Sequence, residues 1–543
     1  MILQQMLGFA PAKAEDVLDQ FQKQYNSLVR SGDYSPFVWP YRVLGPHLLI
    51  LYLLLPPTTS RFVNWARYPV FAIIVYLSIS VIRECRSSSV TVAYGIGLLN
   101  AWTILWSATF LIFNDARKNF KRVERRVHDQ IEEEDYPADK GAGFTSGRDV
   151  SCPAELQACH PNGSSPNRVA SRMSDAYKLA HNEKSAKIKQ SSVPTSGPDM
   201  FTWQHLPQTL SHRLDWVADL VTNFRGLGWN HQVSGTLPPP PHIQASLHYP
   251  NQPPENNHVY PSRMSLLRIN LPAFLVCCMV LDILKAVTSR DPYFWSLPPS
   301  VPSPFPYPRA FRVFFSLIYA YTALQTIFLL PPLGFACLLG PETIGDHASP
   351  WLYPRYFGSP AQVWRKGLAG LWGEWWHQLF RYAFEAAGEF IGGDMLGLTK
   401  TSSLGSLVRV VIAFLCSGAL HACASYTTLR NTKPMQGAFA FFAVQPIGII
   451  AQRSFTGLIR KWGWREKIPT WMRGAGNIIV VVVWCWLTGP LVADDFAAGG
   501  IWLFEPLPIS PVRGMMGEGW WRWSGTWARW HSGDRWWQSG LAF

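Results

Sequence analysis

The sequence predicts an all-α, polytopic helical membrane protein with about eight spans, plus or minus two. Three observations predict this class. Hydrophobic residues make up 48% of the 543 residues and charged residues only 15%, well below the roughly 25% of soluble domains. Aromatic residues reach 14%, with 26 Trp, a ring type that membrane–water interfaces favour. The apolar residues also gather in separate blocks.

The apolar blocks set the number of spans, because a straight span needs about 20 apolar residues. The clearest blocks are 90–113, 311–330, 404–428 and 475–492. The block 43–55 is short and bounded by prolines in "LGPHLLILYLLLPP", so it either crosses the membrane or re-enters. The predicted spans are 43–55, 67–82, 90–113, 269–287, 311–330, 404–428, 437–452 and 475–492.

A long polar insert separates the third block from the fourth. We expect a charged helix at its start and disorder in the Ser-, Pro- and Asn-rich stretch 145–200, which cannot bury enough apolar surface to fold. The chain is therefore predicted to have three parts. These are N-terminal membrane helices at 1–113, a cytoplasmic, partly disordered insert at 114–205, and a membrane core with interfacial helices at 206–543.

Basic residues predict which side of the membrane the insert occupies. Lys and Arg are dense between positions 117 and 126, and such clusters beside a span stay cytoplasmic. Counting spans from there also puts the basic stretch 453–473 in the cytoplasm. This agreement indicates eight spans with both termini lumenal, and an unused sequon at Asn162. Loop bias and anionic lipid explain the net charge of +13 better than nucleic acid does.

Polar side chains stand out first in "GLWGEWWHQLFRYAFEAAG", 370–388. On one continuous helix, His377 and Arg381 are four residues apart and share a face, with Trp376 and Gln378 beside them. This segment is either a helix lining a site near the membrane surface or an interfacial helix with an aromatic belt.

A histidine also lies inside an apolar run, in "FLCSGALHACASY", 414–426. An ionisable residue within a span costs a few kcal/mol, so His421 is a functional candidate, and a neutral imidazole is a candidate general base. The alternatives are a structural histidine, or a nucleophile–base pair with Ser417, for which the Gly-x-Ser-x-Gly elbow is missing. In "FFAVQPIGIIAQ", Gln445 either bonds across helices or contacts substrate.

We predict no metal site and no cofactor. The polar pair Cys152 and Cys159 lacks a second ligand cluster for zinc. Asp494 and Asp495 form only one acidic motif, whereas diphosphate-binding prenyl enzymes need two. Three residues apart on a helix, Asp282 and Lys285 are expected to pair with each other.

The combination "WGEWWHQLFRY" and "FLCSGALHA" resembles the wax synthase-like acyltransferases of filamentous fungi, within the membrane-bound O-acyltransferase group. Pieces from about 210 to 514 resemble the same group, among them "LDILKAVTSRDPYF" and "GIWLFEPLPISPVRG". The resemblance implies a multi-pass enzyme of the endoplasmic reticulum that moves an acyl group from acyl-CoA to an alcohol. The membrane histidine of the family falls on His421, and its Trp-His-Gln motif falls on Trp376, His377 and Gln378.

The expected mechanism uses His421 and His377 as catalytic residues. His421 takes the proton of an acceptor hydroxyl as its oxygen attacks the thioester, while His377, Gln378 or a backbone N–H near Gly418 stabilises the oxyanion. Basic groups such as Arg365, Lys366 and Arg381 are expected to hold the CoA phosphates. The predicted substrate-binding residues are Trp376, Gln378, Arg381, Ser417 and Gln445.

The expected acceptor is a lipophilic secondary metabolite, such as a terpenoid or polyketide, and the expected acyl group is acetyl. The alternatives are a long-chain wax ester synthase and, from another class, a membrane transporter. One geometric condition follows from the sequence. His421 lies about 17 residues into its span, roughly 25 Å deep, so the segment 370–388 has to dip inward for His377 to reach it.

Overall fold

A computed structural model describes residues 14–58, 60–126, 200–247, 262–430, 432–523 and 528–543. Its contacts divide the chain into two units, residues 1–124 with 202–543, and residues 125–201. Most of the predicted disordered stretch and Asn162 lie outside the described residues. The all-α, polytopic class is confirmed, because seven described helices are long and apolar enough to cross a membrane.

These membrane-length helices account for seven of the eight predicted blocks. They are α4 (Arg61–Trp65) with α5 (Arg67–Glu84), α6 (Val90–Leu111), α12 (Arg263–Thr288), α13 (Pro308–Pro331) with η4 (Pro332–Leu339), α18 (Ser403–Tyr426), η9 (Met435–Phe439) with α19 (Ala440–Ala443) and α20 (Gln445–Lys461), and α21 (Thr470–Ala498).

Shorter elements connect and flank them. The helices are α2 (Ala14–Arg30), α3 (Leu44–Leu53), α7 (Ala116–Asn119), α10 (Leu210–Thr222), α11 (Pro241–Ser246), α14 (Pro341–Ile344), α15 (Ala361–Lys366), α16 (Leu368–Gly370), α17 (Arg381–Glu389) and α22 (Pro511–Met515), with the π-helical turns η7 (Leu371–Trp375) and η8 (Phe390–Met395). The 3-10 turns are η1 (Tyr41–Val43), η3 (Pro292–Trp295), η5 (Gly345–Ala348), η6 (Pro350–Leu352), η10 (Ile501–Leu503) and η11 (Trp536–Gln538). The strands are β1 (Ser35–Pro36), β2 (Val38–Trp39), β3 (Cys85–Arg86), β4 (Arg122–Arg126), β5 (Met200–Gln204), β6 (Arg529–His531) and β7 (Gly540–Ala542).

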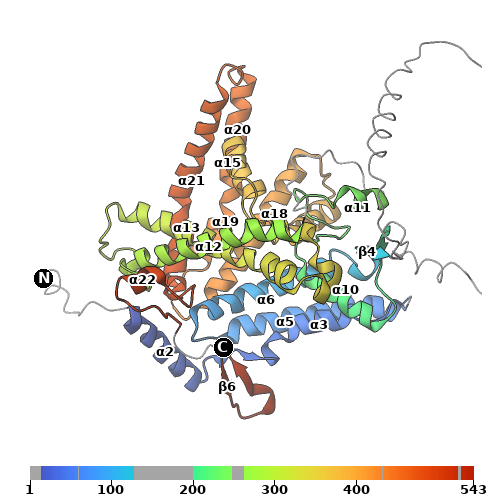
Figure 1. The fold of residues 1–543 in the computed structure, drawn as a ribbon, viewed down its shortest axis with the longest axis horizontal. Coiled ribbons are helices and arrows are strands. Elements are labelled where there is room, and N and C mark those ends of the chain that lie inside the picture. Colours follow the sequence, from blue (N-terminus) through green and yellow to red (C-terminus); the bar gives the residue numbers. More distant parts are fainter. Residues whose placement is uncertain (1–13, 59, 127–199, 248–261, 431, 524–527) are drawn as a thin grey trace, which may run out of the picture. The chain divides into compact units, whose positions relative to one another are not determined.

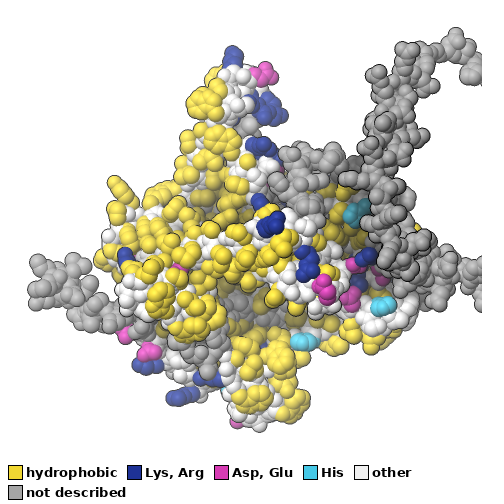
Figure 2. Space-filling view, viewed as in Figure 1, with side chains coloured by type: hydrophobic (Ala, Val, Ile, Leu, Met, Phe, Trp, Pro, Cys, Tyr) yellow, Lys and Arg dark blue, Asp and Glu magenta, His cyan; other side chains and the backbone are white. Residues whose placement is uncertain are grey.

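Side chains cap two of the long helices at their N-termini. Ser262 accepts a hydrogen bond from the Ser265 N–H before α12, and Ser402 accepts one from the Gly405 N–H before α18. Each satisfies a backbone donor that has no partner within the helix. Between their ends, α12 and α21 carry exposed apolar side chains such as Val276 and Val482. Figure 2 shows apolar side chains over these helices and basic ones where α20 and α21 meet, as expected beside lipid.

The short block 43–55 forms α3, which packs beside α5 and α6 (Figure 1). Before α3, the Phe37 N–H donates to the carbonyl of Arg86, just ahead of α6. After α3, the Arg117 guanidinium donates to the carbonyl of Leu55, just beyond the end of α6. The segment between these contacts therefore runs the length of α6. Helix α3 has ten residues, about half the length of a helical span, so the described residues hold seven membrane-length helices and an eighth crossing stays a prediction.

The two ends of the described chain meet in a small sheet. Strand β2 pairs antiparallel with β7, and β7 with β6. Residues 38–39 and 540–542 therefore lie at the same end of the bundle, beside the start of α6. This supports termini on one side of the membrane, and the lumenal assignment of that side stays a prediction.

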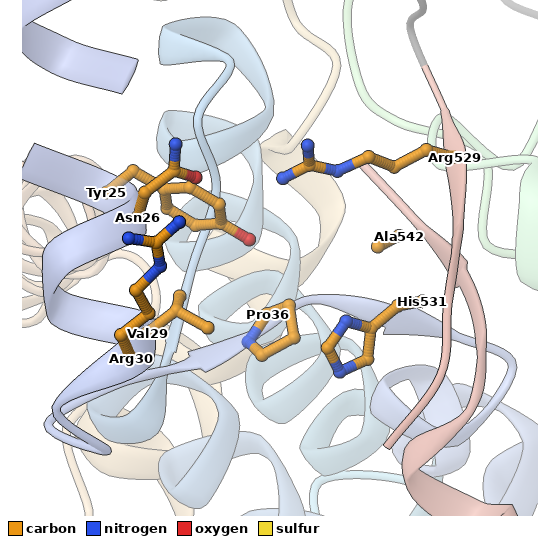
Figure 3. A pocket seen from close by; sticks show the side chains of 8 residues that line it. All are labelled: Tyr25, Asn26, Val29, Arg30, Pro36, Arg529, His531 and Ala542. Atoms are coloured by element: carbon orange, nitrogen blue, oxygen red, sulfur yellow. The ribbon is translucent and has the colours of Figure 1, made fainter. Parts of the chain in front are cut away.

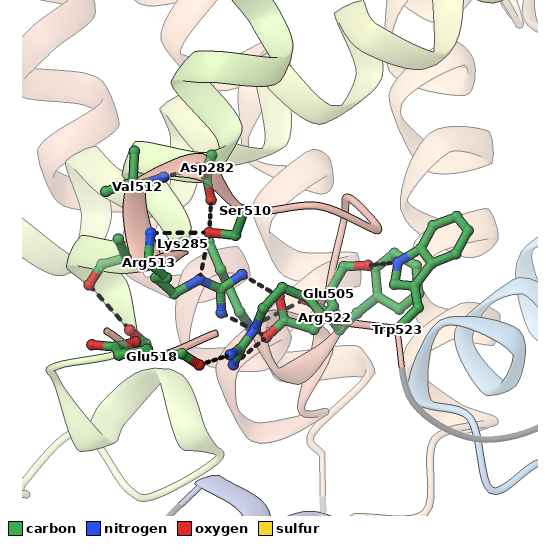
Figure 4. A network of polar contacts seen from close by, with 12 residues as sticks. Asp282, Lys285, Glu505, Ser510, Val512, Arg513, Glu518, Arg522 and Trp523 are labelled. Atoms are coloured by element: carbon green, nitrogen blue, oxygen red, sulfur yellow. Dashed lines mark hydrogen bonds and ion pairs between the residues drawn. The ribbon is translucent and has the colours of Figure 1, made fainter. Parts of the chain in front are cut away.

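The expected ion pair between Asp282 and Lys285 is wrong, because each side chain binds the segment after α21 (Figure 4). The Asp282 carboxylate accepts from the Ser510 hydroxyl and, at 2.8 Å, from the Val512 N–H. The Lys285 ammonium donates to the carbonyl of Trp502 and lies 3.8 Å from Glu505. Both groups are buried, where full pairing with nearby polar groups outweighs an exposed i,i+3 contact. The two segments that resemble the family, 281–294 and 500–514, are therefore joined by these hydrogen bonds.

Helices α6 and α18 approach most closely at Gly97. A Cβ at this position would lie 2.0 Å from the Cys423 carbonyl oxygen. The Gly97 N–H donates to the Thr427 hydroxyl at 3.1 Å, and that hydroxyl donates to the Ala93 carbonyl at 2.7 Å. The pair of helices is therefore joined by backbone contact, which tolerates no side chain at position 97.

We predict that Gly97→Ala separates α6 from α18 and lowers stability by about 1–3 kcal/mol, as overpacking does. The melting temperature in detergent measures this. Gly95→Ala is the matched control, because its added Cβ would meet no described atom within 4 Å. Equal melting temperatures for the two variants would contradict the close packing.

Candidate active site

The segment after α16 bends into the helix bundle. The Trp372 ring in η7 lies 5.7 Å from Phe414, near the middle of α18, and 6.2 Å from Phe442 of α19. The segment therefore reaches the depth of the α18 interior. This meets the geometric condition for His377 to approach His421.

The expectation of one continuous helix over 370–388 is wrong. Helix η7 ends at Trp375, residues 376–380 are not helical, and α17 begins at Arg381. The Arg381 guanidinium donates to the carbonyl of Gly373 at 2.8 Å and to the Gln378 amide oxygen at 2.9 Å. The Gln378 amide nitrogen in turn donates to the Trp376 carbonyl. These side-chain bonds take backbone groups that a helix would otherwise pair internally, and they hold the turn that carries His377.

His377 sits among aromatic rings. Its ring centroid lies 5.4 Å from Trp376, 5.5 Å from Phe328 and 5.8 Å from Phe357. Its Nδ1 atom is buried and has no hydrogen-bond partner in the described part of the chain. Burial lowers the pKa of His377 to about 3, with a smaller contribution from His421 nearby. The imidazole is therefore neutral at physiological pH, with a nitrogen free for a ligand.

His421 lies near the end of α18 that faces the start of α6. Its Nδ1 atom is 2.7 Å from the Tyr94 hydroxyl, and its ring stacks on Phe442 at 4.5 Å. Phe442 also packs on Trp372, whose η7 segment leads into His377. Trp376 packs on Trp372 at 5.8 Å and on His377 at 5.4 Å, so a continuous run of aromatic contacts links the two predicted histidines.

Tyr94 is a residue that the sequence reasoning missed. Its helix was assigned to the N-terminal part of the chain, ahead of the predicted core. The sequence does show a tyrosine within an apolar span. Such a residue indicates a polar contact inside the bundle, because a buried hydroxyl usually finds a hydrogen-bond partner. The sequence does not show which residue that partner is.

Gln445 lies behind the site and is 1% exposed. Its amide oxygen accepts from the indole N–H groups of Trp372, at 3.1 Å, and Trp484, at 2.9 Å. Its amide nitrogen donates to the Phe441 carbonyl at 2.7 Å. Gln445 therefore joins three helical segments and fixes the ring of Trp372, and its contact with substrate stays a prediction.

The remaining residues that the sequence singled out lie at different places around the site. Trp376 packs on Trp372 and Phe357 at the wall of the site, while Ser417 is partly buried one turn before His421. The adjacent acidic residues bind different partners, because neighbours on a helix point in different directions. Asp494 accepts from the Tyr293 hydroxyl, and Asp495 accepts from Ser425.

A separate cavity of about 270 Å³ lies between α2 and β6. Figure 3 shows the guanidinium of Arg529 and the ring of His531 pointing from β6 toward Tyr25 and Arg30 on α2. None of the predicted site residues lines it. This cavity is therefore distinct from the histidine site.

Comparison with known proteins points to the same segment. Residues 353–444, which contain both histidines, match the model of the membrane bound O-acyl transferase family. Over these residues the chain is of the membrane-bound O-acyltransferase type. The chain is similar to acetyltransferase ataH of Aspergillus terreus, with 29% identity over 27% of the chain and 46% of the relative.

Two longer matches are acetyltransferases of other fungi. The acyltransferase-type chain is 24% identical to eriL of Hericium erinaceus over 49% of the chain and 67% of the relative. It is 26% identical to ple2 of Rhodocybe pseudopiperita over 51% of the chain and 64% of the relative. The chain thus spans between about half and two thirds of the length of these three relatives. No solved structure matches it.

We predict that Gln445→Leu destabilises the site. Leucine has a similar size but leaves two indole N–H groups without an acceptor, and each buried unpaired donor costs about 1–3 kcal/mol. The melting temperature in detergent should fall. Gln244→Leu is the control, because the hydrogen bond of the Gln244 side chain among the described residues is to the Pro239 carbonyl at the edge of α11. An unchanged melting temperature for Gln445→Leu would contradict the bracing role.

A further histidine, outside the candidate site, gives a pH prediction. His231 stacks on Phe120 at 4.2 Å, and neither ring nitrogen has a partner in the described regions. Burial lowers the pKa of His231 to about 3, so the unfolded chain binds this proton first. The free energy of unfolding therefore falls as pH drops from about 6.5 toward 3, by at most about 1.4 kcal/mol per pH unit.

His231→Phe keeps the ring stack and removes this proton uptake. We expect the difference in melting temperature, variant minus native chain, to increase as the pH falls from 7 to 5. His212→Phe, at an exposed position, is the control. A constant difference across this pH range would count against the assignment.

Proposed function

We propose that the protein is an O-acyltransferase that moves an acetyl group from acetyl-CoA to a hydroxyl of a lipophilic secondary metabolite, such as a terpenoid or polyketide. The observation that carries this proposal is the run of ring contacts that links His421 through Phe442, Trp372 and Trp376 to His377, inside the segment that matches the family model. The relatives ataH and eriL are acetyltransferases, which supports the acetyl group. Multi-pass insertion in the endoplasmic reticulum is part of the proposal.

The two imidazoles fit the two needs of acyl transfer. A hydroxyl is too weak an acid to ionise alone near neutral pH, so a base has to take its proton during attack. His421 is that base, through Nε2, since Nδ1 faces Tyr94. The C–O ester bond forms, the C–S bond breaks, and the proton passes from His421 to the CoA sulfur.

His377 is suited to the oxyanion of the tetrahedral intermediate. Because the pKa of His377 lies far below 7, its imidazole is uncharged and carries one N–H. That N–H can donate a hydrogen bond to the oxyanion. Donors fixed before the reaction stabilise developing charge most effectively in a water-poor site. The aromatic rings around His377 supply that environment and exclude water, which would otherwise hydrolyse the thioester.

Of the three basic residues predicted to bind the CoA phosphates, two are already in ion pairs. Lys366 is paired with Glu374, and Arg381 is paired with Glu385. Arg365 is exposed at the end of α15, and no ion pair is found for it among the described residues. We therefore assign phosphate contact first to Arg365.

The test is acyl transfer by membranes that contain the expressed chain. Labelled acetyl-CoA and labelled long-chain acyl-CoA are supplied separately, each with a hydroxylated terpenoid or a fatty alcohol. Label in an acetyl ester of the terpenoid supports the proposal. Label only in a long-chain ester favours the wax synthase alternative, and no ester from any combination contradicts an acyltransferase.

We predict that His421→Ala and His377→Ala each lower the transfer rate by about 10²- to 10⁴-fold, as expected for a general base or an oxyanion donor. Membrane insertion should be unchanged. His531→Ala, in the separate cavity, is the control and should keep full activity. Full activity in either site variant would refute its proposed role.

A further inference from the structure

We propose that Tyr94 is a positioning residue that orients the His421 imidazole and accepts from its Nδ1–H while Nε2 takes a proton. This inference rests on the proposed function. Tyr94 lies on α6, far in sequence from the matched segment 353–444, and its hydroxyl is 2.7 Å from His421 Nδ1. The N-terminal helices therefore contribute to the site itself.

The position of Tyr94 relative to His421 is fixed by rigid elements. Gly97, one turn after Tyr94, touches the backbone of Cys423 just after His421. Thr427 bonds across to Ala93 and Gly97 on either side of Tyr94. A hydrogen bond framed by backbone contacts on both helices keeps its length better than one between flexible side chains.

Two proton arrangements fit a hydroxyl beside Nδ1. If the phenol donates, Nδ1 accepts and Nε2 carries the proton, so Nε2 cannot act as a base. If Nδ1–H donates to the phenol oxygen, Nε2 is bare and basic. Only the second arrangement persists after Nε2 takes a proton, because both nitrogens of an imidazolium are donors. Catalysis by His421 through Nε2 therefore needs Tyr94 as the acceptor from Nδ1–H.

A carboxylate on α21 is bonded to α18 close to His421. Asp495 on α21 is 6% exposed, and its Oδ1 atom accepts from the Ser425 hydroxyl at 2.9 Å, one turn beyond His421. The next residue, Phe496, packs against the Tyr94 ring at 5.6 Å. Helix α21 thus contacts both members of the α6–α18 pair, without a hydrogen bond between Asp495 and the Tyr94 hydroxyl in the described regions.

Titratable groups near His421 come from several elements. Tyr94 contacts it from α6, and His377 lies in the turn after η7. Asp495 of α21 bonds Ser425, one turn beyond His421. Phe442 stacks on one face of the His421 ring. Tyr94 is therefore the hydrogen-bonding group at Nδ1 in the described part of the chain.

The test is steady-state acyl transfer by Tyr94→Phe across pH 5 to 9. The variant keeps the ring packing and removes the hydroxyl. We expect kcat to fall by about 10- to 100-fold with KM within about twofold, because orientation of the base is lost while substrate contacts persist. The acidic limb of the rate profile should also move to lower pH, because the imidazolium loses an acceptor.

Tyr76→Phe is the matched control, because Tyr76 is exposed on α5. A purely structural role would lower the melting temperature of Tyr94→Phe and leave the pH profile of the surviving enzyme unchanged, which would overturn the inference. An unchanged kcat would overturn it as well. If the native chain transfers no acyl group, the proposed function fails. If the native chain is active and Tyr94→Phe is equally active, only the role of Tyr94 fails.

Discussion

The backbone contact between α6 and α18 at Gly97 is the constraint on which the site depends. It leaves no room for a side chain, so the two helices hold one separation and one register. That register sets Tyr94 opposite His421. If the helices moved apart by the width of a methyl group, the hydroxyl would leave hydrogen-bond range and the imidazole would lose its orientation.

A second constraint places the other histidine. The turn that carries His377 lies within the bundle because Gln445 holds Trp372 from behind, and because Gln378 and Arg381 bind the backbone of the turn. Buried aromatic rings then surround the imidazole and keep it uncharged. Burial of this kind disfavours the protonated form of histidine, and a neutral imidazole is the form that proton transfer and oxyanion donation require. The cost to stability in acid follows from the same burial.

The sequence predicted the membrane class and seven long apolar helices, because an apolar run is a local signal for a span. It also singled out His421, since a histidine within such a run is conspicuous, whereas the role of His377 was predicted from the family resemblance, and both roles stay predictions. Three features left no such signal. The break at Trp376 comes from bonds between side chains and distant backbone groups, Tyr94 looks like an ordinary aromatic in a span, and Asp282 and Lys285 have partners more than 200 residues away.

The most direct test of the account is an experimental structure with a bound non-hydrolysable thioether analogue of acetyl-CoA. The account predicts that the acyl carbon lies within about 4 Å of His421 Nε2, with a nitrogen of His377 in hydrogen-bond range of the acyl oxygen. An analogue bound with its acyl group out of reach of both histidines would contradict it.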